Sequence, residues 1–245
     1  MSEHTFSLEN RNILVTGASS GIGRATAILC AQMGAKLILT GRNKERLDET
    51  LSMLDSPGHD AYPADLTNPE ELKQLVKYCP DLNGVVFSAG MAELAPFKML
   101  SENHIDRVMS INFFAPVNLT QLLLKNKKIL PSASLVYITA VAEHVCPMGS
   151  SIYSASKSAL TAVVKTLALE LARNNIRANC ISPGYVKTEM LEKLPSAEQY
   201  FSLAPLKDIE ATDIANGIVY LLSPAARWVT RSTLVIDGGI TIPIR

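Results

Sequence analysis

The chain is 245 residues long, and 47% of its residues are hydrophobic while 19% are charged. This length and apolar content favour one sizeable folded core and exclude an intrinsically disordered chain. The 23 basic and 23 acidic residues cancel to a formal net charge of zero, so the composition gives no sign of a general nucleic-acid-binding surface.

Short apolar strands alternate with longer helical patterns along the whole chain. Strands are predicted at 12–16, 36–40, 60–64, 84–88, 134–139, 177–182 and 233–237. Helices are predicted at 21–33, after the second strand through about 54, from about 69, at 101–125 and at 151–174, with further helical segments between 188 and 228. Near-continuous apolar strands between helices indicate one α/β domain over residues 1–245. We expect a doubly wound parallel sheet of about seven strands with helices on both faces.

Cysteine and histidine positions give no sign of a metal site. The four cysteines and four histidines are scattered without metal-ligand spacing, so we expect reduced thiols and no metal. The first residues include acids and no apolar segment typical of a signal peptide, and no apolar run reaches the length of a membrane span. We therefore expect a cytoplasmic protein without a membrane-spanning segment.

A glycine-rich turn follows the first predicted strand. Residues 16–23 have the sequence Thr-Gly-Ala-Ser-Ser-Gly-Ile-Gly, and a helix is expected to begin at Gly21. Glycine lets a ligand approach the backbone closely, and a helix N-terminus offers unpaired N–H groups to a pyrophosphate. No Lys-Ser or Lys-Thr pair follows, so a nucleoside-triphosphate loop fits poorly. The turn predicts a dinucleotide site; a glycine turn without a ligand is the alternative.

Several further motifs occur in an order that resembles the classical short-chain dehydrogenases/reductases. The chain has Tyr-Ser-Ala-Ser-Lys at 153–157, and Ser-Ala-Gly at 88–90 stands where that family has Asn-Asn-Ala-Gly. Asn112, Pro-Gly at 183–184 and Asp-Gly-Gly at 237–239 follow the same order. The resemblance spans nearly the whole chain. It implies a single-domain Rossmann-type fold and a nicotinamide dinucleotide cofactor.

The resemblance also implies which residues hold this cofactor. They come from the glycine turn, from the ends of later strands and from the Tyr-Ser-Ala-Ser-Lys motif. Asp65 and Leu66 are expected beside the adenine, and Val186 and Thr188 beside the nicotinamide carboxamide. The full set comprises Gly17, Ser19, Ser20, Gly21, Ile22, Arg42, Asp65, Leu66, Ser88, Ala89, Gly90, Tyr153, Lys157, Pro183, Gly184, Val186 and Thr188.

The end of the second strand bears on the choice between NAD(H) and NADP(H). An acid there would bind the adenosine ribose hydroxyls and repel a 2′-phosphate, but this chain has Thr40-Gly41-Arg42. Arg42 can pair with a 2′-phosphate through a planar, charge-assisted contact, and Ser20 can add a hydroxyl. We expect NADP(H) rather than NAD(H). The alternative interpretation is that Arg42 is a solvated loop charge, as Lys44 and Arg46 are taken to be.

Tyr153 and Lys157 are four residues apart on a predicted helix and therefore share a face. A nearby ammonium, aided by a positive nicotinamide ring, would lower the pKa of the phenol from about 10. Tyr153 would then exchange a proton with the substrate during hydride transfer. By resemblance, Lys157 also holds the nicotinamide ribose, and Asn112 helps to carry a water-linked proton path. The expected function is an NADP(H)-dependent oxidoreductase that interconverts a carbonyl and a secondary alcohol.

One family residue does not match. The catalytic serine of the family lies thirteen positions before the tyrosine, where this chain has Ala140. Losing one such hydrogen-bond donor typically costs about 3–4 kcal/mol, or roughly a hundred- to thousandfold in rate. Thr139 is the obvious substitute, but neighbouring strand residues point to opposite faces, so only a bulge would re-aim it. Three explanations stay open. The alanine is an engineered substitution; or it is natural, and Thr139, a water or another hydroxyl replaces the serine; or the protein has lost the catalytic activity.

The family resemblance also bears on the substrate and on the assembly of the chain. Residues 188–208 are expected to form a substrate lid. Its apolar residues favour a medium-sized or lipophilic carbonyl compound, although ordinary packing also explains them: Met190, Leu191, Leu194, Tyr200, Phe201 and Leu203. The family often assembles through its two long helices, here about 101–125 and 151–174, so a homodimer or homotetramer is expected. The alternative function is a non-catalytic dinucleotide-binding sensor or assembly protein.

Overall fold

A single parallel sheet organises the chain. The computed structural model describes residues 5–192, 204–207 and 209–241. Its strands are β1 (Asn12–Thr16), β2 (Lys36–Gly41), β3 (Asp60–Pro63), β4 (Leu82–Phe87), β5 (Ile129–Ile138), β6 (Arg177–Pro183) and β7 (Thr233–Ile236). They pair in the order β3-β2-β1-β4-β5-β6-β7, all parallel. The predicted seven strands and doubly wound order are confirmed, and the strand order reverses between β1 and β4.

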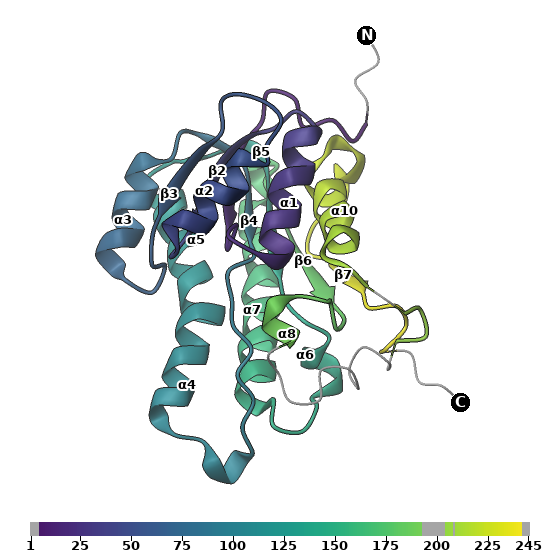
Figure 1. Cartoon of the computed structure of the whole chain (residues 1–245). Helices are drawn as coiled ribbons and strands as arrows, with labels where there is room; N and C mark the ends of the chain where they lie inside the picture. The colour runs from purple at the N-terminus through teal and green to yellow at the C-terminus, as the bar shows by residue number, and fades with distance from the viewer. Residues whose placement is uncertain (1–4, 193–203, 208, 242–245) are drawn as a thin grey trace.

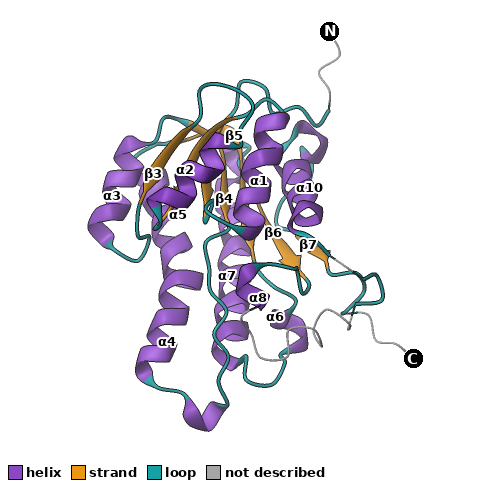
Figure 2. Ribbon diagram, viewed as in Figure 1, coloured by secondary structure: helices purple, strands orange, loops and turns teal. Residues whose placement is uncertain are grey.

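Helices cover both faces of this sheet (Figures 1 and 2). α1 (Gly21–Gln32), α2 (Lys44–Ser52) and α10 (Ala211–Leu222) pack on one face. α3 (Pro69–Tyr78), α5 (Ala115–Lys125) and α7 (Ser151–Leu171) pack on the other. Three shorter helices lie near the carboxyl ends of the strands or extend beyond them: α4 (Glu102–Met109), α6 (Ala142–Val145) and α8 (Glu189–Glu192).

The alternation of side chains along each strand explains the two cores. In β1, Ile13 and Val15 belong to the cluster under α1 and α10, whereas Leu14 belongs to the cluster under α3 and α5. The same alternation holds in β5, where Leu135 and Tyr137 face one way and Val136 the other. Because both faces are buried, the strands are apolar at almost every position.

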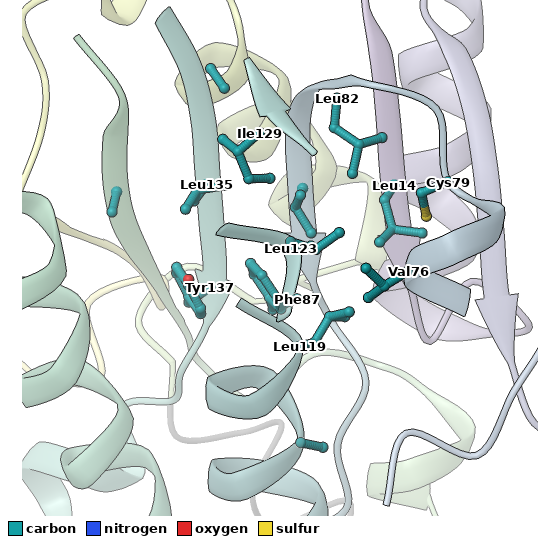
Figure 3. Packing of buried hydrophobic residues seen from close by; sticks show 14 of the residues in the cluster. Leu14, Val76, Cys79, Leu82, Phe87, Leu119, Leu123, Ile129, Leu135 and Tyr137 are labelled. Carbon is teal, nitrogen blue, oxygen red and sulfur yellow. The ribbon is translucent and has the colours of Figure 1, made fainter. Parts of the chain in front are cut away.

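Figure 3 shows the core beneath α3 and α5, where aromatic residues fix the ends of the central strands. The rings of Phe87 on β4 and Tyr137 on β5 are stacked with centroids 4.2 Å apart. The Tyr137 hydroxyl lies 2.8 Å from the Thr120 hydroxyl, so this buried polar group is hydrogen-bonded. These contacts hold the carboxyl ends of β4 and β5 together.

The helix predicted over 101–125 is not continuous. A π-helical turn at Ser110–Phe114 separates α4 from α5, and Ala115 N donates to Ser110 O across this wide turn. Pro116 explains the interruption, because it has no N–H to give to the carbonyl of Asn112 four residues earlier. Such turns are frequent at functional sites, and this one turns Asn112 into the interior.

None of the helices in the described part of the chain combines the length and apolarity needed to cross a bilayer. The proposed lid is described only at its two ends. Met190 and Leu191 lie on or beside α8, whereas Leu194, Tyr200, Phe201 and Leu203 fall outside the described residues.

Candidate active site

A cavity of about 440 Å³ lies at the carboxyl ends of the strands, where the sheet order reverses. Every residue predicted to hold the cofactor lines it, from Gly17 in the glycine turn to Thr188 after β6, and so does Ala140. Asn112 does not line it and lies behind Gly90. The volume is within the usual range of small-molecule sites, about 300–1,000 Å³.

The glycine turn is held against the end of β4 by Thr16. Its hydroxyl donates to the Val86 carbonyl at 3.2 Å and accepts from the N–H groups of Ser88 and Ala89 at 3.0 and 3.1 Å. Gly17 has φ +65°, and a Cβ there would lie 2.8 Å from Ala89 N. Only glycine therefore lets the two loops approach this closely.

The N-terminus of α1 is open toward the cavity. Ser20, its N-cap residue, makes no side-chain hydrogen bond to the helix, and the first turn contains no acidic residue among its positions. A Cβ on Gly23 would lie 2.2 Å from Gly17 O, so the helix begins directly against the turn. Unpaired N–H groups and the positive end of the helix dipole make this end a site for a pyrophosphate.

Arg24, one turn into α1, braces the glycine turn from behind. Its Nη2 donates to Ser19 O at 2.7 Å, and its Nε donates to the Thr50 hydroxyl at 3.0 Å. The same guanidinium pairs with Glu49 at 3.2 Å. The turn is thereby tied to both α1 and α2.

Two arginines stand at the β2 side of the cavity. Arg42 is exposed, lines the cavity and forms no ion pair with any residue of the described chain. Arg46, near the start of α2, also lines the cavity and pairs with Glu189 of α8. The interpretation of Arg46 as a solvated loop charge is therefore wrong, because its guanidinium is held by Glu189 at the cavity. No acidic residue occupies positions 42–44, directly after β2.

Tyr153 and Lys157 both line the cavity from the first turns of α7. Lys157 Nζ lies 5.9 Å from the centroid of the Tyr153 ring and donates to Ile138 O at 2.9 Å. Burial lowers the pKa of Lys157 to about 8, while Glu143 and Cys180 act in the opposite direction. Burial raises the pKa of Tyr153 to about 12, and the Tyr185 phenol adds to the rise.

The expectation that Lys157 makes Tyr153 acidic is therefore not met by the protein alone. The lysine gives its hydrogen bond to the backbone of β5 instead of to the phenol, and burial disfavours the phenolate. Tyr153 is consequently protonated at neutral pH. Its hydroxyl is in the form that a proton donor needs.

Asn112 holds the strand-to-helix connection beside the cavity. Its Oδ1 accepts from Met91 N and its Nδ2 donates to Met91 O, both at 2.9 Å. Nδ2 also lies 3.2 Å from the Ser156 hydroxyl of α7. A Cβ on Gly90 would lie 3.0 Å from Asn112 Oδ1 and 3.5 Å from Lys157 Nζ, so Gly90 leaves room for both side chains.

At the position where the family has its catalytic serine hydroxyl, this chain has the methyl group of Ala140. Ala140 lines the cavity just beyond the end of β5. The Thr139 hydroxyl donates to Ile181 O at 3.1 Å and lies 3.4 Å from Glu143 Oε1. Thr139 also lines the cavity, but its hydroxyl is directed at β6 and Glu143.

A profile described as enoyl-(acyl carrier protein) reductase matches residues 17–241 of this chain. The chain belongs to the classical short-chain dehydrogenase/reductase family. It is 34% identical over 244 residues to 3-oxoacyl-(acyl-carrier-protein) reductase FabG of Thermotoga maritima, covering 96% of this chain and 99% of the relative. It is 31% identical over 249 residues to L-xylulose reductase of Caenorhabditis elegans, covering 96% and 98%.

Solved structures agree with this family membership. A dehydrogenase/reductase from Sinorhizobium meliloti superposes with a TM-score of 0.90 at 31% identity, covering 97% of this chain and 98% of that chain. The family places the chain among the oxidoreductases that bind nicotinamide dinucleotides. The glycine cradle and the open helix N-terminus fit such a cofactor.

Sequence reasoning missed several residues of this short-chain dehydrogenase/reductase site. The cavity is also lined by Arg46, Tyr185 and three residues after β4, namely Met91, Ala92 and Leu94. The Glu143 side chain is buried next to Thr139. Arg46 has a sequence signal, since it stands four residues after Arg42 at a helix start. Within the described residues, no group of three or more His, Cys, Asp or Glu side chains is placed to hold a metal.

Proposed function

We propose that this chain is an NADP(H)-dependent oxidoreductase that interconverts a carbonyl and a secondary alcohol. One observation carries the proposal: the glycine cradle and the Tyr153–Lys157 pair line the same cavity at the sheet reversal. A dinucleotide bound along the cradle would extend toward the phenol. When bound, the nicotinamide supplies a hydride to the substrate carbon or accepts one from it.

The protein's own groups then manage the proton. Tyr153, protonated at neutral pH because burial raises its pKa to about 12, donates to the substrate oxygen during reduction. Lys157 lies 5.9 Å from the phenol ring and places a cation beside the developing phenolate. In the reverse direction the same lysine would stabilise the phenolate form of Tyr153, which accepts the proton of the alcohol.

Arg42 and Ser20, which both line the cavity, support NADP(H) as the cofactor. Arg42 is exposed at the cavity and has no ion-pair partner among the described residues, while Arg46 lies one turn away. A planar guanidinium is well suited to a 2′-phosphate. Binding of NADH and NADPH, measured side by side, tests the preference.

Apolar side chains that line the cavity support a substrate with apolar character. Met91, Leu94, Met190 and Leu191 all line the cavity. The relatives differ in the substrates that their names give, an acyl-carrier-protein derivative and L-xylulose. We propose a medium-sized or lipophilic carbonyl compound, which a panel of ketones and 3-oxoacyl thioesters with NADPH tests.

Ala140→Ser is the decisive variant for the chemistry. A restored hydroxyl is expected to raise turnover by about a hundred- to thousandfold, because one donor to the reacting oxygen is worth about that much. Thr139→Val in the unaltered chain is the matched test of compensation. Turnover that survives this change shows that Thr139 does not replace the serine. No hydride transfer by either the unaltered chain or the serine variant would reject the proposed activity.

The second candidate function is a dinucleotide-binding protein that has lost the chemistry. The observation that favours it is the combination of Ala140 with a Thr139 hydroxyl already donating to Ile181 O at 3.1 Å. Such a protein would bind NADPH with normal affinity and turn over nothing. Robust turnover by the unaltered chain eliminates this candidate.

We further propose that the chain forms a homodimer or homotetramer through α4, α5 and α7. Leu169 on α7 is 59% exposed and Phe114, at the junction of α4 and α5, is 50% exposed. Ala155 and Ala162 of α7 are also exposed, and small side chains let a second helix approach closely. Exposed large apolar side chains beside small ones are typical of an interface.

A further inference from the structure

A buried carboxylate lies behind the wall of the cavity. Glu143 is on α6, three residues after Ala140, and its side chain is only 3% exposed. Ala140, Val141 and Ala142 line the cavity, whereas Glu143 directs its carboxylate into the protein. A buried carboxylate is costly unless it is hydrogen-bonded or paired, so its position calls for a physical role.

The partners of Glu143 connect it to α7. The Thr161 hydroxyl donates to Glu143 Oε2 at 2.5 Å, and the Thr139 hydroxyl lies 3.4 Å from Oε1. His144 Nε2, on a half-exposed ring, lies 3.3 Å from the same oxygen. Thr161 follows Lys157 by one helical turn, as Lys157 follows Tyr153, so the three share one face of α7.

Lys157 is anchored to the end of β5, next to the residue that contacts Glu143. Its Nζ donates to Ile138 O, the residue immediately before Thr139. Among the described residues, no carboxylate lies within ion-pair distance of this ammonium. The Glu143 carboxylate, hydrogen-bonded to Thr161 one helical turn after Lys157, therefore acts on the lysine through space and raises its pKa against the effect of burial.

We propose that Glu143 is a positioning residue of this active site, whose buried negative charge keeps Lys157 protonated while its hydrogen bonds fix Thr139 and Thr161. The inference rests on the proposed function only in that Lys157 is taken to stabilise the phenolate of Tyr153. The charge relationship itself belongs to the folded protein and can be measured without cofactor or substrate.

The remaining groups around the lysine do not supply this charge. Tyr153 on α7 is protonated at neutral pH, since burial raises its pKa to about 12. Cys180 on β6 is a neutral thiol, because burial raises its pKa to about 12. Lys165 is an exposed cation one turn beyond Thr161, and His144 contributes no negative charge. Glu143 is thus the acid that opposes the effect of burial on Lys157, whose pKa is lowered to about 8.

The test follows Lys157 directly in the full-length protein without ligands. Lysine labelled with ¹³C at Cε is titrated by NMR, and the Lys157 signal is assigned by its loss in Lys157→Met. In Glu143→Gln the titration midpoint of Lys157 is expected to fall by about one pH unit, as loss of a nearby opposite charge predicts. Glu170→Gln, an exposed acid on the same helix, serves as the matched control and should leave the midpoint unchanged.

The outcome that overturns the proposal is an unchanged Lys157 midpoint in folded Glu143→Gln. If that variant does not fold, Glu143→Ala removes the same charge with less polar bulk, and the same comparison applies. The pH dependence of turnover provides the functional readout, with its alkaline limb expected to move to lower pH by the same amount. A shifted midpoint without any hydride transfer would uphold the role of Glu143 and reject the proposed function.

Discussion

The Arg46 guanidinium of α2 pairs with the Glu189 carboxylate of α8 across the mouth of the cavity. The pair connects the wall after β2 with the described start of the proposed lid. Arg42 stands beside it without an ion-pair partner in the described chain. The two arginines thus differ: one is held by an acid, and the other is available to an anion.

Arg42→Ala is expected to weaken NADPH binding about tenfold or more, because a hydrogen-bonded charge pair is worth about 1.5–3 kcal/mol. NADH has no 2′-phosphate, so its affinity should change little. Fluorescence titration of both cofactors measures the difference. Lys44→Ala is the control, since Lys44 lies in the same segment but pairs with Asp48 at 2.6 Å. An equal loss for NADH and NADPH would contradict a 2′-phosphate site at Arg42.

Lys157→Met is expected to stabilise the protein at neutral pH. Because the pKa of Lys157 is lowered from 10.5 to about 8, the unfolded chain binds more protons between these two pH values. The free energy of unfolding of the unaltered chain therefore rises with pH across that window. Below it, the buried charge costs about 3 kcal/mol, partly offset by the bond to Ile138, so the expected gain is about 1–2 kcal/mol.

The measurement is chemical denaturation of both proteins from pH 7 to pH 10.5. The advantage of Lys157→Met should shrink as pH rises above about 8. Lys165→Met, an exposed site on the same helix, should show no such gain. A pH-independent difference between Lys157→Met and the unaltered chain would show that packing, and not charge, determines the effect.

Gly17→Ala is expected to abolish dinucleotide binding and to destabilise the fold. The new Cβ would lie 2.8 Å from Ala89 N, in addition to the strain of φ +65°. Gly58→Ala is the matched control, because Gly58 also has a positive φ, +93°, but its nearest neighbour would be 4.0 Å away. Isothermal titration with NADPH and thermal unfolding compare the two. Equal effects at both positions would mean that backbone strain alone, and not closeness to Ala89, matters at Gly17.

Leu169→Glu is expected to reduce the oligomer to smaller species, because it places a charge where the exposed Leu169 lies about two helical turns beyond the exposed Ala162 on α7. Sedimentation velocity at several protein concentrations measures the outcome. Met53→Glu is the control, since Met53 is similarly apolar and 46% exposed but lies just after α2. A sedimentation profile that Leu169→Glu leaves unchanged would remove α7 from the proposed interface.

Much of the fold could be predicted because local patterns determine it. The strand at 12–16 coincides with β1, and the strand at 177–182 falls one residue short of β6. Apolar strands joined by helices leave few arrangements other than a parallel sheet. Gly17, Tyr153 and Lys157 could be placed at one cavity because the carboxyl ends of parallel strands meet there.

The parts that escaped prediction depend on contacts between distant segments. Arg46 pairs with a residue 143 positions later, which no local pattern encodes. The direction of the Thr139 hydroxyl depends on Ile181 of the neighbouring strand, at 3.1 Å. The raised pKa of Tyr153 reflects burial, which the Tyr-to-Lys spacing does not reveal.

Arg24 has a consequence for the thermodynamics of ligand capture. It already holds the Ser19 carbonyl at 2.7 Å and joins it to Thr50 at 3.0 Å. A phosphate arriving at this loop therefore meets a preorganised receptor, and little conformational entropy is lost in ordering it. Because little entropy is lost in fixing the loop, more of the favourable binding enthalpy contributes to affinity.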